Sequence, residues 1–257
     1  PELSLAKAAG LAIGATGGLL VDEYLRTSDP KIWAAGDMNE IVHKVSGRKV
    51  RVPLAGPANR QGRIAASNAL GQSLKYHGAL GSSVVKVFDA TAACTGLSEA
   101  AARAAGFDVG SAIVVRDHHA AYYPGAKEMV LKIVFDRKTE RLLGGQAFGE
   151  EGVEKRIDVL AAPIPGTPVP VTLQDLAELD LAYAPPYSSA NDPLNVAAFV
   201  GLNDITGFSP LITAAELQSL LAARIEAGSE AQGPLVLDVH NLGEYEVSHL
   251  KGALNIP

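Results

Sequence analysis

The sequence contains very little cysteine, and Cys94 carries its only thiol. A single cysteine excludes an internal disulfide and a cysteine-based metal cluster, and it favours a reducing, cytoplasmic setting. The sequence also lacks any long hydrophobic run, because apolar stretches such as Met129–Phe135 are too short to span a bilayer. We therefore expect no disulfide framework and no membrane-spanning helix.

A surplus of positive charge is absent as well. The formal net charge is −6, so no basic surface is indicated, and nucleic acid is not an expected partner. Hydrophobic residues make up 47% of the sequence and charged residues 19%, which is ordinary for a globular protein and excludes disorder by composition. No signal peptide is visible, and the sequence starts at Pro1 instead of Met. We expect it to be a piece of a longer protein.

Turn signals and hydrophobic periodicity divide the sequence into three segments, which we expect to be domains over residues 1–77, 78–200 and 211–257. In the first segment the pattern predicts brief strands at Leu19–Val21 and Ile32–Ala35. A polar, hairpin-like stretch follows at His43–Arg51, and the run Asn59–Leu74 is typical of a helix.

The second segment contains several adjacent strands with helices grouped beside them. The predicted strands are Val84–Phe88, Ile113–Val115, Met129–Phe135 and Leu142–Phe148. Helices are predicted after the capping residues Ser98 and Thr172 and over Gly152–Ala161, whereas the proline-rich stretch Pro163–Pro170 cannot be helical. This order predicts an α+β domain with a largely antiparallel sheet.

The third segment follows a predicted loop near Gly201–Pro210. Thr213 is expected to cap a helix that runs to Ala223, and a Gly/Ser/Gln-rich linker follows at Gly228–Gly233. The apolar run Leu235–Val239 is typical of a buried strand. This segment is too short to bury a good core unaided.

The chemically most informative stretch is Thr27–Asp37, an apolar strand that ends in Gly36 and Asp37. Ligands of α/β folds bind where strands end. Gly36 has no side chain, so a ligand can approach its backbone closely, and the Asp37 carboxylate can accept hydrogen bonds from ligand hydroxyl groups. A bare Gly-Asp pair is more often a simple turn, so the length of the whole string matters.

That string resembles the second FAD-binding motif of the pyridine-nucleotide disulfide oxidoreductases. The resemblance implies that the first segment is the C-terminal part of a Rossmann-like α/β domain, in which Gly36 and Asp37 bind FAD and Asp37 holds its ribityl chain. The family follows this motif with a Pro-Leu-Ala segment leading into a helix, here Pro53, Leu54 and Ala55. By resemblance, this helix start faces the flavin ring, where its partial positive charge stabilises negative charge.

Two further strings carry tyrosine next to proline, Tyr122–Gly125 and Leu181–Pro193. The prolines of the second string hold it extended. This string resembles the dimerisation domain of coenzyme A-disulfide reductases and related NADH oxidases. The resemblance implies that Tyr122 and Tyr183 are catalytic and reach into the partner subunit's active site, where a neutral phenol donates a hydrogen bond to a thiolate or thiol. Core packing is the alternative role for both.

Cys94 and the pair His118-His119 also draw attention as reactive or metal-binding groups. Cys94 lies in what resembles a strand-to-helix link, and the resemblance implies a structural role, because the family's redox cysteine lies in its N-terminal FAD domain. Neighbouring residues on a strand point to opposite faces, so we expect two surface histidines and no metal site.

The last stretch, Leu237–Pro257, resembles the opening of a rhodanese domain and implies a rhodanese-like α/β fold. Two positions depart from that pattern, because His240 stands where the family usually has Arg and Ser248 where it usually has Gly. No sulfur-transfer residue can be named, since the cysteine of that family would come later. An unrelated small α/β unit is the alternative.

Together these resemblances imply part of a class I pyridine-nucleotide disulfide oxidoreductase, most like a coenzyme A-disulfide reductase with a C-terminal rhodanese domain. The expected cofactors are FAD and NAD(P)H, the expected assembly is a homodimer, and the expected substrate is coenzyme A disulfide or a related persulfide. An NADH oxidase or peroxidase and a non-catalytic dimerisation module remain open as alternatives. The chain alone is expected to be inactive, because the FAD pyrophosphate loop, the NAD(P)H domain and the redox cysteine lie outside it.

Overall fold

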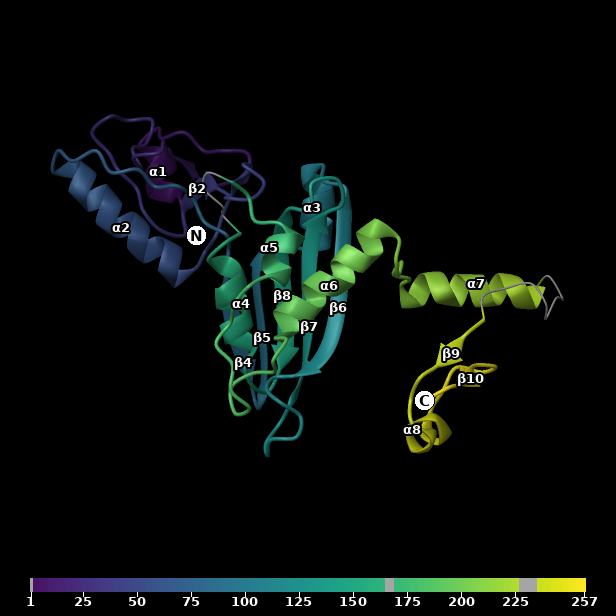
Figure 1. Ribbon diagram of the computed structural model, residues 1–257. Coiled ribbons are helices and arrows are strands. Elements are labelled where there is room, and N and C mark those ends of the chain that lie inside the picture. Colours follow the sequence, from purple (N-terminus) through teal and green to yellow (C-terminus); the bar gives the residue numbers. More distant parts are fainter. Residues whose placement is uncertain (1, 165–168, 227–234) are drawn as a thin grey trace. The chain divides into compact units, whose positions relative to one another are not determined.

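The structure is a computed structural model that describes residues 2–164, 169–226 and 235–257 (Figure 1). It divides into two compact units, Pro1–Ser209 and Pro210–Pro257. Within the described residues, no helix is both long enough and apolar enough to cross a membrane. Part of the predicted proline-rich stretch and the whole predicted linker Gly228–Gly233 lie outside the described residues.

The first unit begins with a small sheet and a long helix. Its elements are α1 (Ser4–Ala8), β1 (Leu19–Leu20), β2 (Asn39–Val42), β3 (Lys49–Val50) and α2 (Ala55–Ala69). Strand β1 pairs in parallel with β2, and β2 forms the predicted hairpin with β3. Helix α2 begins four residues before the predicted start at Asn59, because Pro57 fits in a first helical turn, where its missing N–H has no partner to lose.

The prediction of a regular strand at Ile32–Ala35 is wrong. The structure has only an isolated bridge between Arg26 and Trp33. The two arms of a tight turn bond each other locally, since the Thr27 N–H donates to the Ile32 carbonyl oxygen at 2.9 Å and the Ala34 N–H to Leu25 at 3.0 Å. Leu25 has φ +63°, which interrupts the extended backbone that a longer ladder would need.

The rest of the first unit is built on a five-stranded antiparallel sheet in the order β4-β5-β8-β7-β6. The strands are β4 (Ser83–Val87), β5 (Ala90–Gly96), β6 (Val109–Asp117), β7 (Glu128–Asp136) and β8 (Leu142–Gly149). The largely antiparallel sheet is confirmed. Strand β5 was not predicted, because it consists of Ala, Thr, Cys and Gly and lacks the large apolar residues that signal a strand.

Helices α3 (Glu99–Ala105), α4 (Val153–Ala161), α5 (Leu173–Ala177) and α6 (Pro193–Thr206) complete this part. The predicted caps are confirmed: the Ser98 hydroxyl accepts a hydrogen bond from the Ala101 N–H, and Thr172 forms a capping box with Asp175. The loop predicted from Gly201 is wrong up to Thr206, which is helical. Helix α6 packs closely at Gly201, because this residue has no side chain; an added Cβ would lie 3.0 Å from the Leu173 side chain.

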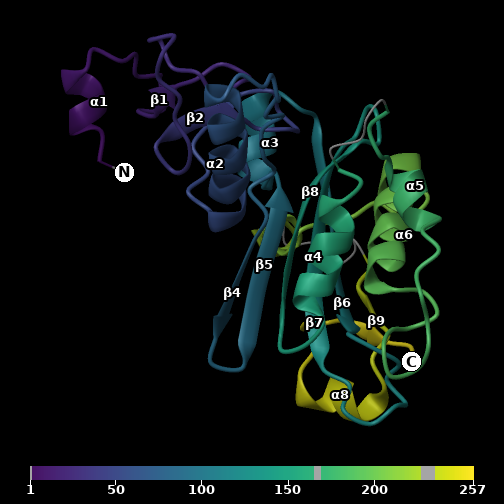
Figure 2. The same ribbon diagram turned by 90° about the vertical axis from the view of Figure 1, so that its left-hand side faces the viewer.

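Helices α4, α5 and α6 lie on one face of the sheet (Figures 1 and 2). Alternation along β7 directs Met129, Leu131 and Ile133 into the core beneath the helices, whereas Val130 lies on the other face and is 38% exposed. The face away from α4, α5 and α6 therefore presents several exposed apolar side chains, among them Val85, Ile113, Val115, Val130 and Phe148.

The second unit contains α7 (Ala214–Glu226), β9 (Leu237–Asp238), α8 (Leu242–Val247) and β10 (Leu254–Asn255), with β9 and β10 parallel. The predicted cap is confirmed, because the Thr213 hydroxyl accepts from the Glu216 N–H at 3.2 Å. The prediction that Leu235–Val239 is buried is wrong, since Leu237 is 52% exposed. No described residue of this unit is buried, which agrees with the expectation of a segment too short to form a core.

Glycines in the two parts of the first unit make a direct stability test. A Cβ added at Gly144 would press on the Leu97 backbone and lie 2.8 Å from the Thr95 carbonyl oxygen, whereas Gly62 in α2 faces open space. We expect Gly144→Ala to lower the free energy of unfolding by about 1–3 kcal/mol and Gly62→Ala to raise it by about 0.5–1 kcal/mol. Urea denaturation followed by circular dichroism measures both changes, and equal effects would contradict the close packing at β8.

Candidate functional site

Gly36 and Asp37 lie against the N-terminal half of α2. The Gly36 N–H donates to the Gln61 side-chain oxygen at 3.1 Å, and a Cβ at Gly36 would lie 3.7 Å from the Ala58 side chain. Gly36 has φ +93°, a conformation that an L-residue rarely adopts. Asp37 is exposed. The structure therefore brings the Gly-Asp pair beside the first turns of the helix that Pro53, Leu54 and Ala55 introduce.

The start of α2 offers unused hydrogen-bond donors. Leu54 is the N-cap residue, and its apolar side chain makes no capping hydrogen bond. Pro57 has no N–H, so the donors of this first turn are those of Ala55 and Gly56. A helix end of this kind attracts an electron-rich group. These N–H groups and the exposed Asp37 carboxylate are thus available as a donor pair and an acceptor for a ligand.

The two predicted catalytic tyrosines lie together although 61 positions separate them in sequence. Their hydroxyl oxygens are 3.2 Å apart, which is hydrogen-bond distance. Tyr122 lies in the loop between β6 and β7 (residues 118–127), which we call the first tyrosine loop. Tyr183 lies between α5 and α6 (residues 178–192), the second tyrosine loop. Tyr122 is 77% exposed and Tyr183 47%, so the core-packing alternative does not describe either side chain.

The hydrogen bond between the two phenols raises the pKa of Tyr183 above the ordinary tyrosine value, because it stabilises the protonated form of that phenol. Either hydroxyl can be the donor in this bond. Whichever phenol accepts keeps its own hydroxyl hydrogen for a group that approaches from solvent.

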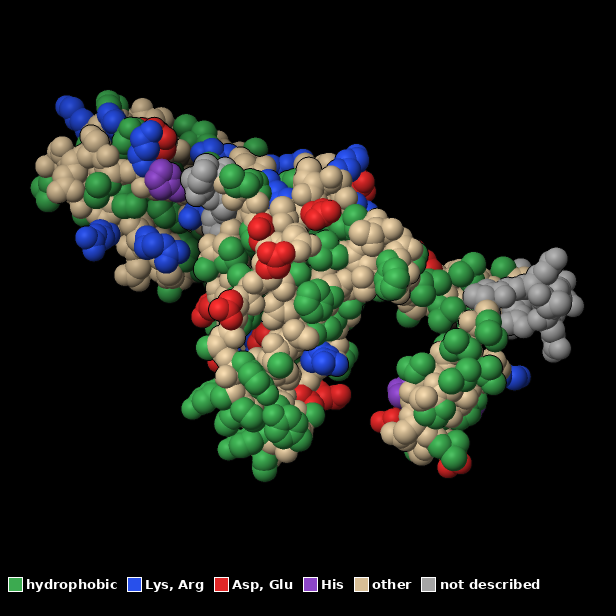
Figure 3. All heavy atoms as spheres, viewed as in Figure 1, with side chains coloured by type: hydrophobic (Ala, Val, Ile, Leu, Met, Phe, Trp, Pro, Cys, Tyr) green, Lys and Arg blue, Asp and Glu red, His purple; other side chains and the backbone are tan. Residues whose placement is uncertain are grey.

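Exposed apolar and aromatic side chains gather at the lower end of the sheet in Figure 3. The sheet register places the β4–β5 turn, the first tyrosine loop and the C-terminal end of β8 at one end. Exposed side chains of these segments and of the second tyrosine loop are Val87, Phe88, Tyr122, Tyr123, Phe148, Tyr183 and Tyr187. We call this end of the sheet the tyrosine end.

The opposite end of the sheet adjoins the part that carries Asp37. There Arg141, in the turn after β7, donates to the Val45 carbonyl oxygen at 3.2 Å, and Val45 lies in the turn between β2 and β3. Strand β7 has 9 residues between the two ends, which corresponds to roughly 30 Å at the usual rise per residue. In one chain, therefore, the tyrosines and Asp37 lie at opposite ends of the sheet.

A buried ion pair joins the two tyrosine loops. Arg156 on α4 is 1% exposed, and its Nη2 lies 2.8 Å from an oxygen of Asp192, which is 2% exposed. The same nitrogen donates to the His118 carbonyl oxygen at 2.7 Å, and Asp192 accepts from the Ser188 hydroxyl at 2.7 Å. Asp192 also caps α6. The sequence analysis did not single out this pair.

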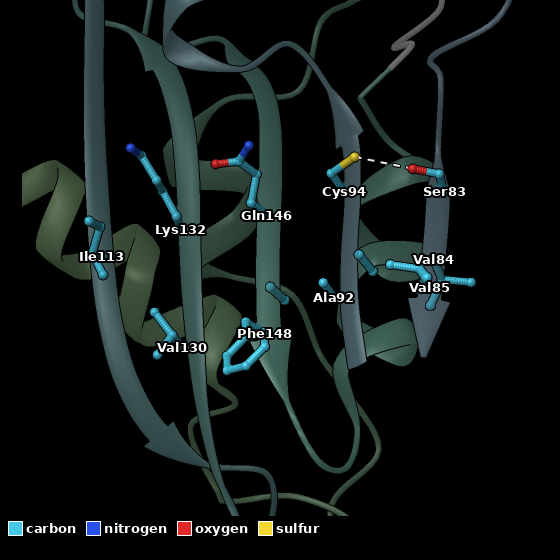
Figure 4. A pocket seen from close by; sticks show the side chains of 12 residues that line it. Ser83, Val84, Val85, Ala92, Cys94, Ile113, Val130, Lys132, Gln146 and Phe148 are labelled. Carbon is cyan, nitrogen blue, oxygen red and sulfur yellow. Dashed lines mark hydrogen bonds between the residues drawn. The ribbon is translucent and has the colours of Figure 1, made fainter. Parts of the chain in front are cut away.

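Cys94 lies on β5 and not in a link before a helix, so that expectation is corrected. Its sulfur is 3.3 Å from the Ser83 hydroxyl oxygen, at one edge of a shallow groove of about 500 Å³ on the open face of the sheet (Figure 4). Lys132 and Gln146 line the same end of the groove, and Val130 and Phe148 line the other. The Lys132 ammonium is paired with the Glu99 carboxylate at 2.7 Å, and a structural role for Cys94 stays a prediction.

The histidine pair differs from its prediction. Strand β6 ends at Asp117, so the two rings no longer alternate across a sheet; their centroids are 4.2 Å apart. His119 is buried and packs edge-on against Tyr123, so it is not a surface residue. Partial burial lowers the pKa of His118. In the described parts of the chain, no group of three or more His, Cys, Asp or Glu residues could hold a metal ion.

Two family models match the chain. Residues 82–193 match the dimerisation domain of pyridine nucleotide-disulphide oxidoreductases, and residues 1–62 match the model for pyridine nucleotide-disulphide oxidoreductase itself. An NAD(P)H sulfur oxidoreductase (CoA-dependent) of Pyrococcus abyssi is 42% identical over 200 residues, which is 78% of this chain. A coenzyme A disulfide reductase of Staphylococcus epidermidis is 32% identical over 200 residues, 77% of this chain.

Among solved structures, the reduced CoADR-RHD of Bacillus anthracis matches 100% of this chain and 44% of its own, with 39% identity and a TM-score of 0.87. The chain spans 44% of the length of both curated relatives. Its fold and family matches define a protein with pyridine nucleotide-disulphide oxidoreductase domains. More narrowly, it is homologous to coenzyme A disulfide reductases and to CoA-dependent sulfur oxidoreductases.

The Arg156–Asp192 pair makes stability depend on pH. Burial alone would raise the pKa of the Asp192 carboxyl, but the hydrogen bond and charge of Arg156 and the Ser188 hydroxyl hold that pKa below its usual value. The charged form is thus favoured in the folded state, so its contribution is complete above the unfolded pKa of about 3.9 and is lost as pH falls through the lower folded pKa.

We expect Asp192→Asn to destabilise the protein at pH 7 by about 3–5 kcal/mol, because it leaves the Arg156 charge buried without its counter-charge. The difference from the wild type should shrink as pH falls below about 4. Urea denaturation at a series of pH values measures it. A difference that stays constant down to the acid limit of folding would contradict the role of the charge.

Proposed function

We propose that this chain is part of an FAD-dependent NAD(P)H oxidoreductase that reduces coenzyme A disulfide or a related persulfide. The observation that carries the proposal is the Tyr122–Tyr183 phenol pair, exposed at the tyrosine end of the sheet. The homology to coenzyme A disulfide reductases and CoA-dependent sulfur oxidoreductases supports the same substrate class.

In this proposal, the segment around Gly36 and Asp37 binds the flavin. In the proposal, Asp37 accepts hydrogen bonds from the ribityl hydroxyls, and the N–H groups at the start of α2, after Pro53 and Leu54, face the ring. Gly36 supports this reading through its positive φ, which keeps the turn tight without a side chain over the ligand. FAD would supply the transfer of electrons from NAD(P)H; the residues of this chain bind and orient it.

The phenol pair would act on the sulfur of the substrate. Reduction of a disulfide releases a thiolate, and a neutral phenol can donate a hydrogen bond to that sulfur. In the proposed arrangement one phenol donates to the other, and the accepting phenol keeps its own hydrogen for the substrate sulfur. The raised pKa of Tyr183 is consistent with a phenol that stays protonated at neutral pH.

The separation within one chain supports a homodimer. Roughly 30 Å of sheet lie between the tyrosine end and the end that adjoins the Asp37 segment. Side chains cannot span this length, so the phenols would serve the flavin of a second copy. The exposed aromatic residues beside them would then meet that copy.

We further assign residues 1–77 to the FAD-binding domain, 78–200 with the rest of α6 to the dimerisation domain, and 211–257 to the start of a rhodanese-like domain. Support for the last assignment comes from the CoADR-RHD structure, which matches this chain along its whole length including residues 211–257, and from the parallel pair β9 and β10. A single cysteine also favours a reducing, cytoplasmic setting for the reaction.

Loss of the Asp37 carboxylate should weaken flavin binding. We expect Asp37→Ala in the full-length protein to raise the dissociation constant for FAD about 10- to 100-fold, because it removes hydrogen bonds to a charged group. Flavin content after purification and FAD titration of the apoprotein measure the change. Glu23→Gln, an exposed carboxylate paired with Lys75, is the matched control and should retain flavin. A colourless but folded wild-type dimer would instead favour a non-catalytic module.

Removal of either phenol hydroxyl should slow the reaction without loss of flavin. We expect Tyr122→Phe and Tyr183→Phe to lower kcat for coenzyme A disulfide about 100-fold, the usual size of a lost proton donor. Tyr187→Phe, in the same loop and 70% exposed, should leave kcat unchanged. Thiol release is measured beside oxygen consumption, and NADH-dependent oxygen consumption without thiol release would favour an oxidase.

A further inference from the structure

One buried cation contacts both tyrosine loops. The Arg156 side chain extends from α4 between them, and it is the largest fully buried side chain among the described residues. Its neighbours on the same buried face of α4 are Val153, Ile157 and Leu160. A charged residue in that apolar row requires an explanation, because burial of a charge is costly unless the charge is paired and hydrogen-bonded.

The first tyrosine loop is held through its backbone. Nη2 of Arg156 donates to the His118 carbonyl oxygen at 2.7 Å, at the point where β6 has just ended. Nη1 donates to the Gly152 carbonyl oxygen at 3.1 Å, and Gly152 lacks the Cβ that would collide with that nitrogen. The guanidinium therefore fixes where the chain turns away from the sheet toward Tyr122.

The second tyrosine loop is held through a carboxylate. Nη2 and Nε of Arg156 lie 2.8 and 3.4 Å from the two oxygens of Asp192. Asp192 in turn accepts hydrogen bonds from the Ser188 hydroxyl and from the Leu194 N–H. The same carboxylate therefore both holds the loop and caps the start of α6. A further bond joins the loops directly, since the Ala120 N–H donates to the Pro185 carbonyl oxygen at 3.3 Å.

An apolar residue of similar size would fill the same space at less cost. Replacement of a buried ion pair by well-packed hydrophobic residues is often neutral or stabilising, so the pair is weak evidence for stability. The planar guanidinium adds a fixed geometry. Its N–H donors point in set directions, so the acceptors in the two tyrosine loops must lie at set angles to each other. Tyr122 lies about four residues beyond the bound His118, and Tyr183 about five residues before Ser188, whose hydroxyl donates to Asp192.

We propose that Arg156 is a positioning residue, which sets the Tyr122–Tyr183 phenol pair by holding both tyrosine loops. This inference rests on the proposed function of the phenols and adds a residue that touches neither flavin nor substrate. Arg156 acts through the loops, so its removal changes the relative position of the two phenols but leaves both hydroxyl groups in the protein.

The test compares Arg156→Met and Arg156→Lys with the wild type in the full-length enzyme, and repeats Arg156→Met in the Tyr122→Phe, Tyr183→Phe background. We expect Arg156→Met to lower kcat for coenzyme A disulfide about 100-fold with an unchanged KM for the nicotinamide. Arg156→Lys keeps the charge but not the fork, so its loss should be smaller. In the double phenylalanine background Arg156→Met should have no further effect.

Arg137→Met is the matched control. Arg137 pairs with Asp204 at 2.6 Å in the turn that leads out of β7, at the opposite end of the sheet from the phenols, and it should leave kcat unchanged. The proposal is overturned if Arg156→Met retains wild-type kcat, if Arg137→Met lowers kcat as much, or if Arg156→Met lowers it equally in both backgrounds. If Arg156→Met does not fold, Arg156→Lys is compared in the wild-type and double phenylalanine backgrounds instead, and the same outcomes apply to it.

A spectroscopic readout separates this proposal from the proposed function. With 3-fluorotyrosine at position 183, the fluorine NMR titration should give a lower pKa in Arg156→Met than in the parent, because the bond to Tyr122 is lost. An unchanged pKa overturns the positioning role whatever the kinetics show. If the double phenylalanine variant retains full kcat, the proposed function fails, and the titration alone then decides the role of Arg156.

Discussion

The first unit depends on the need to satisfy the buried charge of Arg156. Removal of an ion from water costs several kcal/mol even after relaxation, so a buried guanidinium must find acceptors for most of its donors. Here the acceptors come from three separate places in the sequence: Gly152, His118 and Asp192. None of them can move away alone without leaving a buried donor of the guanidinium without its acceptor, so the start of α4 and both tyrosine loops are held to one another.

Close packing around the sheet follows from small residues at particular positions. Gly144 on β8 meets the backbone of Thr95 and Leu97, and Gly201 on α6 meets Leu173 and Phe135. Helix α6 starts at the same Asp192 that pairs with Arg156, so the polar network sets where the helix begins and the glycine sets how closely it lies. The ion pair thus fixes the start of α6, and the glycines let the helices lie close to the apolar face that they cover.

Local chemistry made much of the fold predictable. Ser98, Thr172 and Thr213 each cap a helix as expected, because a side-chain oxygen that satisfies a free N–H is a local event. Predictions failed where distant residues decide. Strand β5 has no strongly apolar pattern and forms because β4 and β8 pair with it, whereas Ile32–Ala35 looks like a strand but finds only a local bridge.

In the candidate site, too, local sequence predicts some residues, whereas others depend on contacts between distant parts of the chain. Gly36, Asp37, Tyr122 and Tyr183 stand out in strings that resemble a family, but no string indicates that the two phenols meet. The signal for Arg156 was present: at the spacing of Val153, Ile157 and Leu160 it occupies the buried face of a helix. A second signal was Asp192 before Pro193, the pattern of a capped helix start. Pairing the two requires the fold.

The sheet gives a reason for the assembly of the proposed enzyme. A strand is stiff and has a fixed rise, so the nine residues of β7 keep the phenols far from the Asp37 segment of their own chain. Loops could be shortened or bent to bring them nearer, but paired strands cannot. In the proposed enzyme, a chemistry that needs both the flavin and the phenols would therefore be completed between two copies of the chain. Each copy then supplies what the other lacks, and dissociation of the dimer would remove the phenols from both sites at once.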